Sequence, residues 1–195
     1  MRLVGFDNTM LSLLLNPNSK QREDPHTKKV VTFPKKRADY LLASIQKEKG
    51  KIIVPTPAVA EILTVIGPEA QAYFDIIAQN RLFEVAAFDS RAAIELAFLN
   101  RDVFAAADRK NNQEAYQKIK VDRQILAVLK SRGATEIYTD DSGLSNRARM
   151  CGIIPVGIAD LPLPPDEQQM KLEFERHEEI PQAEQPENMS EPDSD

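Results

Sequence analysis

The stretch that decides the fold is Leu3-Val-Gly-Phe-Asp7, a short apolar run that ends in a carboxylate. Four more short apolar runs follow along the chain, separated by longer segments of helical period: Ile52–Val54, Leu82–Ala86, Ile137–Thr139 and Ile153–Val156. Short strands that alternate with helices are typical of right-handed βαβ units, whose helices cover both faces of a parallel sheet. We therefore predict an α/β protein, a three-layer α/β/α sandwich with a mainly parallel central sheet.

Segments with apolar residues three and four positions apart predict the helices between these strands. We expect them near Thr9–Leu15, Lys36–Lys49, Thr56–Ile66, Glu69–Gln79, Ser90–Ala107, Asp122–Ser131 and Leu144–Met150. Gly133 and Gly152 each stand where a helix should give way to a strand. Both are expected in the left-handed conformation that ends helices.

The net charge of −5 is distributed unevenly over the 195 residues. Residues 160–195 carry 12 acidic and 2 basic side chains and hold six of the 13 prolines, whereas residues 1–159 have a net charge of +5. We predict one domain over residues 1–159. Residues 160–195 are predicted to be a disordered acidic tail rich in Pro and Glu, because they have few large apolar side chains to bury.

Composition excludes several classes of protein. Cys151 is the only cysteine, which excludes a disulfide framework and a cysteine-rich zinc site. No apolar run approaches the roughly 20 residues that a membrane-spanning helix needs. We expect a cytoplasmic protein that has no contact with a membrane.

The informative residues are acids at places where an acid is costly. Asp7 follows the first strand at its carboxyl end, where open parallel sheets bind ligands, although an aspartate there could equally cap the next helix. Glu61 is the only charged residue between Pro55 and Pro68. A helix this apolar is predicted to be buried nearly all round, so Glu61 should face the interior or a cleft. There it needs a cation, a hydrogen-bonding network or a raised pKa.

Three more acids fall in similar positions. Asp122 shares a helical face with apolar residues three, four and seven positions later, and we expect it near the start of its helix. Asp140 and Asp141 follow the fourth predicted strand directly. Acids from separate strand ends and helix starts can converge on one crevice, where a hard divalent cation would neutralise their repulsion.

Four stretches hold these acids in order: Val-Gly-Phe-Asp7-Asn-Thr, Pro-Thr-Pro-Ala-Val-Ala-Glu61-Ile-Leu, Val-Asp122-Arg-Gln-Ile-Leu and Ile-Tyr-Thr139-Asp140-Asp141-Ser-Gly-Leu. In order, spacing and flanking apolar pattern, the chain resembles the PIN-domain nucleases from Leu3 to about Ile158. The resemblance implies that the catalytic, metal-binding acids are Asp7, Glu61, Asp122 and Asp141. It also implies that Asp140 assists as a further metal ligand.

The same resemblance implies the chemistry. The acids would bind Mg²⁺ or Mn²⁺, which activates a water for attack on a phosphodiester bond of single-stranded or structured RNA. Asn8, Thr9 and Thr139 would hold the metal ligands through hydrogen bonds. Many family members have a hydroxyl directly after the first aspartate and Asn next, whereas here Asn8 precedes Thr9.

Many small bacterial PIN proteins of this size resemble VapC toxins of type II toxin–antitoxin pairs, and this chain resembles them too. That resemblance implies a cognate antitoxin protein as partner, and a homodimer.

Two alternatives remain open. One is a haloacid-dehalogenase-type phosphohydrolase, which also begins with a strand that ends in Asp. Its chemistry needs a second Asp two residues later, where this chain has Thr9, and it gives Glu61 and Asp122 no role. The other is a catalytically silent PIN module that binds RNA or protein, which has no evident reason to tolerate so many repelling acids.

Overall fold

The computed structural model describes residues 1–15, 23–24, 27–105 and 113–165. A compact unit runs from Met1 to Leu163. The predicted disordered tail lies outside the described residues from residue 166 onward. No helix within the described part of the chain is both long and apolar enough to cross a membrane.

The centre of the compact unit is a sheet of five parallel strands. The strands are β1 (Leu3–Phe6), β2 (Lys51–Pro55), β3 (Phe83–Ala86), β4 (Glu136–Tyr138) and β5 (Ile154–Val156). Their order across the sheet is β3-β2-β1-β4-β5, so β1 is the central strand. The predicted α/β fold with a parallel central sheet is confirmed.

Helices connect the strands close to the predicted places. They are α1 (Asn8–Leu15), α2 (Pro34–Lys47), α3 (Thr56–Ile66), the 3₁₀ turn η1 (Gly67–Glu69), α4 (Ala70–Gln79), α5 (Ser90–Phe98), the π-helical η2 (Leu99–Phe104), α6 (Gln113–Ser131), α7 (Ser142–Met150) and the 3₁₀ turn η4 (Ile158–Asp160). Gly133 and Gly152 adopt the predicted positive φ of 75° at the ends of α6 and α7.

Two helix predictions were wrong in detail. The helix expected over Ser90–Ala107 is α only to Phe98 and continues as a π-helical segment. The helix expected to begin at Asp122 begins at Gln113 instead. Its first residues include several polar and charged side chains, so the apolar period that marks a buried helix starts only near Val121.

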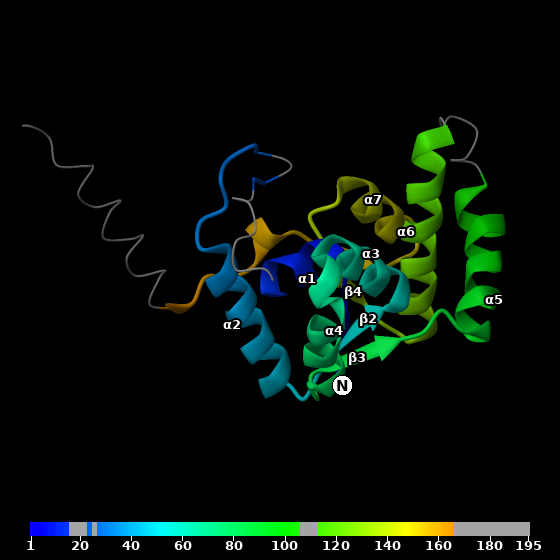
Figure 1. Cartoon of the computed structure of the whole chain (residues 1–195). Coiled ribbons are helices and arrows are strands. Elements are labelled where there is room, and N and C mark those ends of the chain that lie inside the picture. Colours follow the sequence, from blue (N-terminus) through cyan, green and yellow to red (C-terminus); the bar gives the residue numbers. More distant parts are fainter. Residues whose placement is uncertain (16–22, 25–26, 106–112, 166–195) are drawn as a thin grey trace, which may run out of the picture. The chain divides into compact units, whose positions relative to one another are not determined.

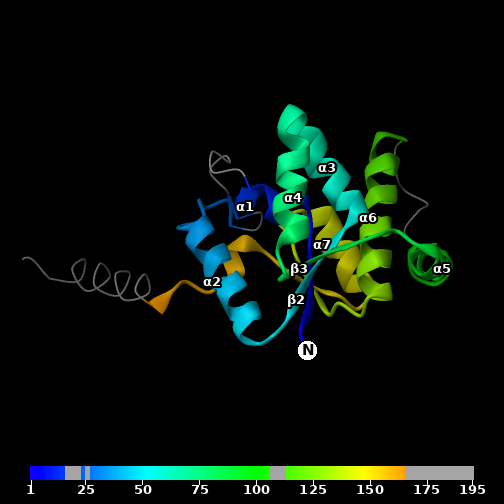
Figure 2. The same cartoon turned by 60° about the horizontal axis from the view of Figure 1, so that its bottom comes forward.

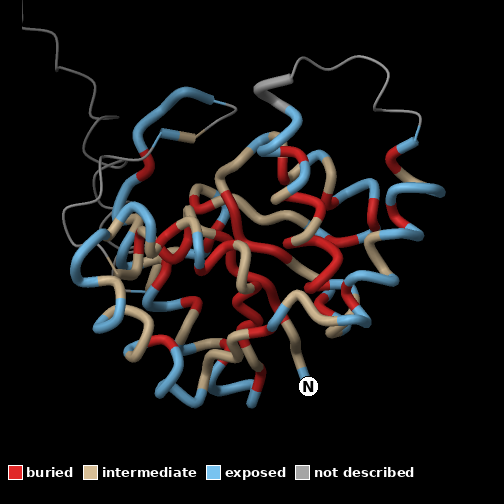
Figure 3. Tube along the Cα trace, turned by 45° about the vertical axis from the view of Figure 1, so that its right-hand side comes forward, coloured by how far each residue is buried: buried red, intermediate tan, exposed pale blue. Residues whose placement is uncertain are grey.

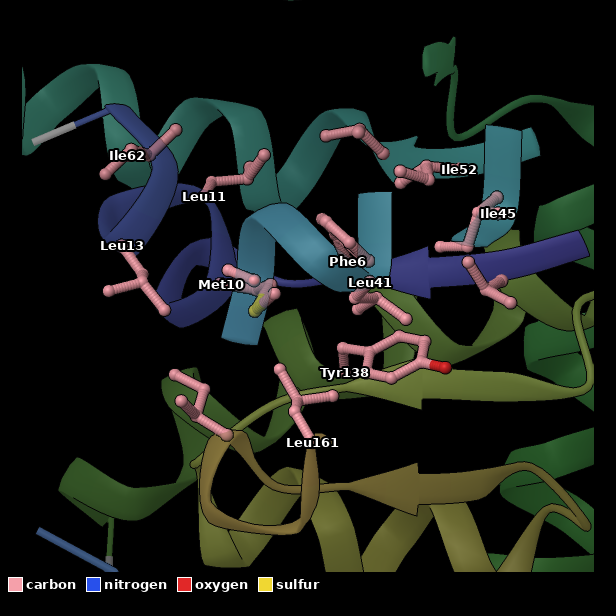
Figure 4. Packing of buried hydrophobic residues seen from close by; sticks show 14 of the residues in the cluster. Phe6, Met10, Leu11, Leu13, Leu41, Ile45, Ile52, Ile62, Tyr138 and Leu161 are labelled. Atoms are coloured by element: carbon pink, nitrogen blue, oxygen red, sulfur yellow. The ribbon is translucent and has the colours of Figure 1, made fainter. Parts of the chain in front are cut away.

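One hydrophobic core lies on one face of the sheet, between the strands and helices α1, α2 and α4. Phe6 and Tyr138, from neighbouring strands, place their ring centroids 5.5 Å apart in an edge-to-face pair. They belong to the same buried cluster as Met10, Leu41 and Ile45 (Figure 4). Figure 3 shows that the buried residues concentrate along the strands and on the inward faces of the helices.

A second core lies on the opposite face, against α5, α6 and α7. Figures 1 and 2 show α1 and α2 on one side of the sheet and α5 and α6 on the other. Helix α6 packs closely on β1 because Gly5 has no side chain. An ideal Cβ at Gly5 would lie 2.5 Å from Leu129 Cδ1. The two cores give the three layers predicted from the sequence.

Helix α3 lies between the two cores, with Val59 and Ile62 in the first and Ala58 in the second. The prediction that this helix is buried nearly all round was wrong. Val65 is 79% exposed, and Thr64 is exposed beside it. Apolar composition alone does not show which side of a helix faces solvent, so this open side was missed.

The close approach at Gly5 predicts the effect of a single methyl group. Gly5→Ala should lower the free energy of unfolding by about 1–3 kcal/mol, because the new Cβ overlaps a fully buried side chain. Chemical denaturation monitored by circular dichroism measures the change.

The matched control is the same substitution in a Leu129→Ala background, where the overlapping atoms are gone. There Gly5→Ala should be less destabilising, with a coupling of at least about 0.5 kcal/mol. An equal loss of stability in both backgrounds would show that Leu129 is not the cause.

Candidate functional site

Asp7 follows β1 and is enclosed by the fold, with 1% of its surface exposed. Its Oδ1 accepts hydrogen bonds from the backbone N–H of Thr9 at 3.0 Å and of Met10 at 3.1 Å, and from the Thr9 hydroxyl at 2.8 Å. Its Oδ2 accepts a hydrogen bond from the hydroxyl of Thr139. Asp7 therefore caps α1 with one oxygen and turns the other towards the end of β4.

Enclosure changes the proton affinity of this group. Burial raises the pKa of Asp7 from 3.8 to about 6, even though the hydrogen bonds from Thr139, Thr9 and Met10 favour the charged form. A carboxylate with this pKa is held in the fold at a cost in stability at neutral pH.

Glu61 lies partly exposed on α3, and the amide of Asn8 donates to its Oε2 at 2.9 Å. Burial raises the pKa of Glu61, and so do the negative charges of Asp122, Asp7 and Asp141, while Lys118 opposes them. The negative charges of three acids from three different segments therefore act on the carboxyl group of Glu61. This interaction alone does not show that the four acids converge on one place, and their convergence stays a prediction.

Asp122 lies on the buried face of α6 and is 4% exposed. The predicted shared face with apolar neighbours such as Ile125 and Leu129 is confirmed, because both are fully buried. The expected position near a helix start was wrong, since α6 begins nine residues earlier, at Gln113. Asp122 Oδ2 accepts a hydrogen bond from Nη2 of Arg147. Burial still raises the pKa of Asp122 despite this partner.

Asp141 is the N-cap of α7, and its Oδ1 accepts from the backbone N–H of Leu144 at 2.9 Å. Its Oδ2 lies 2.5 Å from Nζ of Lys118 on α6. Burial acts to raise the pKa of Asp141, but the hydrogen bonds from Lys118 and Leu144 hold it below its usual value. Asp141 is therefore charged at neutral pH.

Asp140 is held differently from its neighbour. Its Oδ1 accepts from the backbone N–H of Ile158 at 2.8 Å, which ties β4 to the turn η4. Its own backbone N–H donates to the Thr9 hydroxyl at 3.1 Å. One carboxylate oxygen of Asp140 is thus used by the backbone, and its role as a metal ligand stays a prediction.

The three residues expected to support the acids all contact them. Asn8 binds Glu61, Thr9 binds Asp7, and Thr139 joins Asp7 to Asp141 by accepting the backbone N–H of Asp141 at 3.0 Å. With the unusual order Asn-Thr after the first aspartate, each of the two side chains therefore still donates a hydrogen bond to an acid of the site.

Sequence reasoning missed the two basic residues of the site, Lys118 and Arg147. Lys118 stands four residues before Asp122 on the same helix, a spacing that places both on one face and could have indicated it. No comparable local spacing indicates Arg147, which reaches Asp122 from another helix. Both bases line an open cleft of about 480 Å³ together with Asp141.

The acids fit a hard divalent cation in kind, because carboxylate oxygens are its preferred ligands. They are not gathered around a single point. Among the residues that the structure describes, no three Asp, Glu, His or Cys side chains lie close enough to hold one ion. Two of the carboxylates, Asp122 and Asp141, are instead paired with Arg147 and Lys118.

Comparison with known proteins agrees with this architecture. No protein-family model and no curated protein sequence matches the chain. Among solved structures, VapBC2 from Rickettsia felis, bound to a DNA fragment from its promoter, matches with a TM-score of 0.50 and 12% identity, covering 80% of this chain and 98% of that one. VapC20 of Mycobacterium tuberculosis, a toxin that cleaves the sarcin–ricin loop, matches with a TM-score of 0.50 and 16% identity, covering 78% and 98%.

The chain has the PIN-domain fold of these VapC structures. The resemblance inferred from four short motifs is therefore confirmed at the level of the fold. In this PIN-domain fold, Asp7 comes from the end of β1, Glu61 from α3, Asp122 from α6 and Asp141 from the start of α7.

The raised pKa of Asp7 predicts a substitution that stabilises the protein. The folded state binds the Asp7 proton more tightly than the unfolded chain does, so burial of this charge lowers stability above about pH 6, and the effect vanishes below about pH 4. In metal-free buffer at pH 7.5, Asp7→Asn should raise the free energy of unfolding by about 1–3 kcal/mol, since two pKa units correspond to roughly 3 kcal/mol. Denaturant titrations at a series of pH values measure it.

Asp39→Asn is the matched control, because this exposed acid makes only a 4.0 Å pair with Lys35. It should change stability by less than about 0.5 kcal/mol at every pH. If the gain from Asp7→Asn were the same at pH 4 as at pH 7.5, burial of charge would not be its origin.

Proposed function

We propose that the chain is a divalent-metal-dependent endoribonuclease that cleaves phosphodiester bonds of single-stranded or structured RNA. The observation that carries the proposal is the arrangement of the acids on a PIN-domain fold, in which the Thr139 hydroxyl donates to Asp7 and accepts from the backbone N–H of Asp141, and Asn8, next to Asp7, donates to Glu61. Asp7 and Asp141 each cap a helix, but capping explains neither Glu61 nor Asp122. The common use of the four acids is to bind a cation.

Mg²⁺ or Mn²⁺ would be held by Asp7, Glu61, Asp122 and Asp141, with Asp140 as a further candidate. When bound, such an ion lowers the pKa of a coordinated water and neutralises charge on a phosphate oxygen. The chemistry requires no histidine, and the chain has only two, in the segments at residues 26 and 177.

The residues of the chain prepare the acids for this task. The hydroxyls of Thr9 and Thr139 donate hydrogen bonds to the two oxygens of Asp7. These bonds hold the carboxylate in one orientation before a ligand binds. Asn8 does the same for Glu61. The cap on α7 fixes Asp141 through Leu144 N–H and leaves its Oδ2 towards the cleft and Lys118.

Two observations support RNA as the substrate. One of the structurally similar proteins is a toxin that cleaves the sarcin–ricin loop. In addition, residues 1–159 have a net charge of +5, which attracts a polyanion at low salt. The negative charge of the whole chain is concentrated in residues 160–195.

The structure argues against the phosphohydrolase alternative at one residue. That chemistry places a proton-donating acid two residues after the first aspartate, where this chain has Thr9. Thr9 instead donates its hydroxyl hydrogen bond to Asp7 at 2.8 Å. The silent binding module differs from the proposal only in activity, so activity has to distinguish them.

Substitution of the acids tests the proposal directly. With labelled RNA and Mn²⁺, Asp7→Asn and Asp122→Asn should each reduce the cleavage rate by at least about a hundredfold, since even groups that only support metal ligands are worth 10–100-fold. EDTA should abolish cleavage by the unchanged protein. Gel-resolved fragments report the rate.

Asp39→Asn is again the control and should cleave like the unchanged protein. Full cleavage by both site variants would disprove the catalytic assignment. Hydrolysis of p-nitrophenyl phosphate without RNA cleavage would favour the phosphohydrolase. RNA binding without cleavage in any metal would favour the silent module.

We also propose that the chain acts as the toxin of a type II toxin–antitoxin pair, with a cognate antitoxin as partner and a homodimer as its assembled form. The support is the structural similarity to the VapBC2 chain, which was crystallised as a complex. Production of the chain in a bacterial host should stop growth, and Asp7→Asn should not.

Co-production of the protein encoded by a short reading frame beside its gene should restore growth, and the two proteins should purify together. If Asp7→Asn also stopped growth, the toxicity would not be caused by the proposed RNA cleavage. Light scattering of the purified chain measures the predicted dimer.

A further inference from the structure

Two basic side chains enter the acidic cleft from different helices and pair with different acids. Arg147, on α7, donates through Nη2 to Asp122, and Lys118, on α6, lies with Nζ 2.5 Å from Asp141 Oδ2. Both bases line the same open cleft. The oxygens that they contact are Oδ2 of Asp122 and Oδ2 of Asp141, two of the atoms that a bound cation would need.

The two bases differ in how far they are enclosed, since only 18% of the Arg147 side chain is exposed. The side chain of Lys118 is 60% exposed. The Nε of Arg147 is buried but donates to no group in the described part of the chain, so Asp122 is the partner that holds its guanidinium. Gly143 leaves the space in which this guanidinium lies, since a Cβ there would be 2.8 Å from Nη2.

The two bases together carry the same charge as one divalent cation. Asp7, Glu61, Asp122 and Asp141 carry four negative charges when ionised, and Lys118 and Arg147 together bring two positive charges, as one divalent ion does. Removal of Arg147 would leave a carboxylate whose side chain is 6% exposed without its hydrogen-bonded counter-charge, and the charge of Lys118 would compensate it only in part. Such a carboxylate is strongly unfavourable in a folded protein.

We propose that Lys118 and Arg147 are the built-in counter-ions of the metal-free site, and that each must leave its carboxylate when a divalent cation binds. The two bases then compete with the metal for Asp141 and Asp122. They hold the acidic cleft together when metal is scarce and set the metal concentration at which the site is loaded. This inference rests on the proposed metal-dependent function.

Direct metal binding to the full chain tests the competition. Mn²⁺ is titrated by calorimetry into the metal-stripped protein and into Lys118→Met and Arg147→Met, which keep an apolar stem without the charge. Lys118→Met should bind Mn²⁺ about two- to fivefold more tightly, because its ion pair is largely exposed. Arg147→Met should bind about tenfold more tightly or better, because its pair is buried.

Each variant has a matched control that removes the same charge from the same helix. Lys120→Met removes a lysine that contacts the ring of Tyr116, and Arg149→Met removes an arginine that bonds Asn146. Both should bind Mn²⁺ with the affinity of the unchanged protein, within about twofold, because charges away from the acids are screened. If the site variants and the controls gained Mn²⁺ affinity equally, the gain would come from the net charge of the protein, and the proposal would be overturned.

Thermal melting gives a second readout that does not depend on catalysis. In EDTA, Arg147→Met should melt at a lower temperature than the unchanged protein. Saturating Mn²⁺ should raise the melting temperature of Arg147→Met by more than it raises that of the unchanged protein. Unchanged Mn²⁺ affinity in both site variants would overturn the competition while leaving a metal-dependent nuclease intact. If none of the five proteins bound Mn²⁺, the proposed function would fail, and the competition with it.

Discussion

The buried carboxylate of Asp7 is the constraint on which the rest of the structure depends. It stands at the end of the central strand, 1% exposed, and a charge so enclosed costs several kcal/mol unless polar groups surround it. Its four hydrogen-bond donors are the backbone N–H and hydroxyl of Thr9, the N–H of Met10 and the hydroxyl of Thr139. Satisfying Asp7 therefore requires β1, the start of α1 and the end of β4 to meet at one edge of the sheet.

The same edge gathers the other acids. Because β4 pairs in parallel with β1, residues that follow β4 lie beside those that follow β1, and Asp141 arrives near Asp7 through Thr139. Helix α3 packs on both cores and presents Glu61 to Asn8. Once these packing relations are fixed, the repulsion among the acids follows. Lys118 and Arg147 reduce it from within the chain.

Much of the fold could be predicted because strands and buried helices leave local patterns of apolar residues. Asp7 and Asp141 could be placed because Asp7 directly follows β1 and Asp141 comes shortly after the end of β4, and in a parallel sheet position along the chain determines position in space. The start of α6 could not, because its first turns include several polar and charged residues, which do not give the apolar period that predicts a buried helix. The exposed side of α3 was missed for the opposite reason, since Val65 is apolar and yet faces solvent. The pairing of Arg147 with Asp122 joins two helices, and no local pattern encodes it.

Capping alone does not explain an aspartate at position 7. A helix cap needs one oxygen that accepts backbone N–H groups, which a serine or an asparagine would supply without charge. Asp7 uses Oδ1 in this way, but it also keeps a second oxygen bound to Thr139 and a pKa raised by burial to about 6. Residues that hold a local arrangement at a cost in stability are expected where function requires them. The stability of the fold therefore does not explain the charge on Asp7, and this agrees with the proposal that a cation binds at the sheet edge.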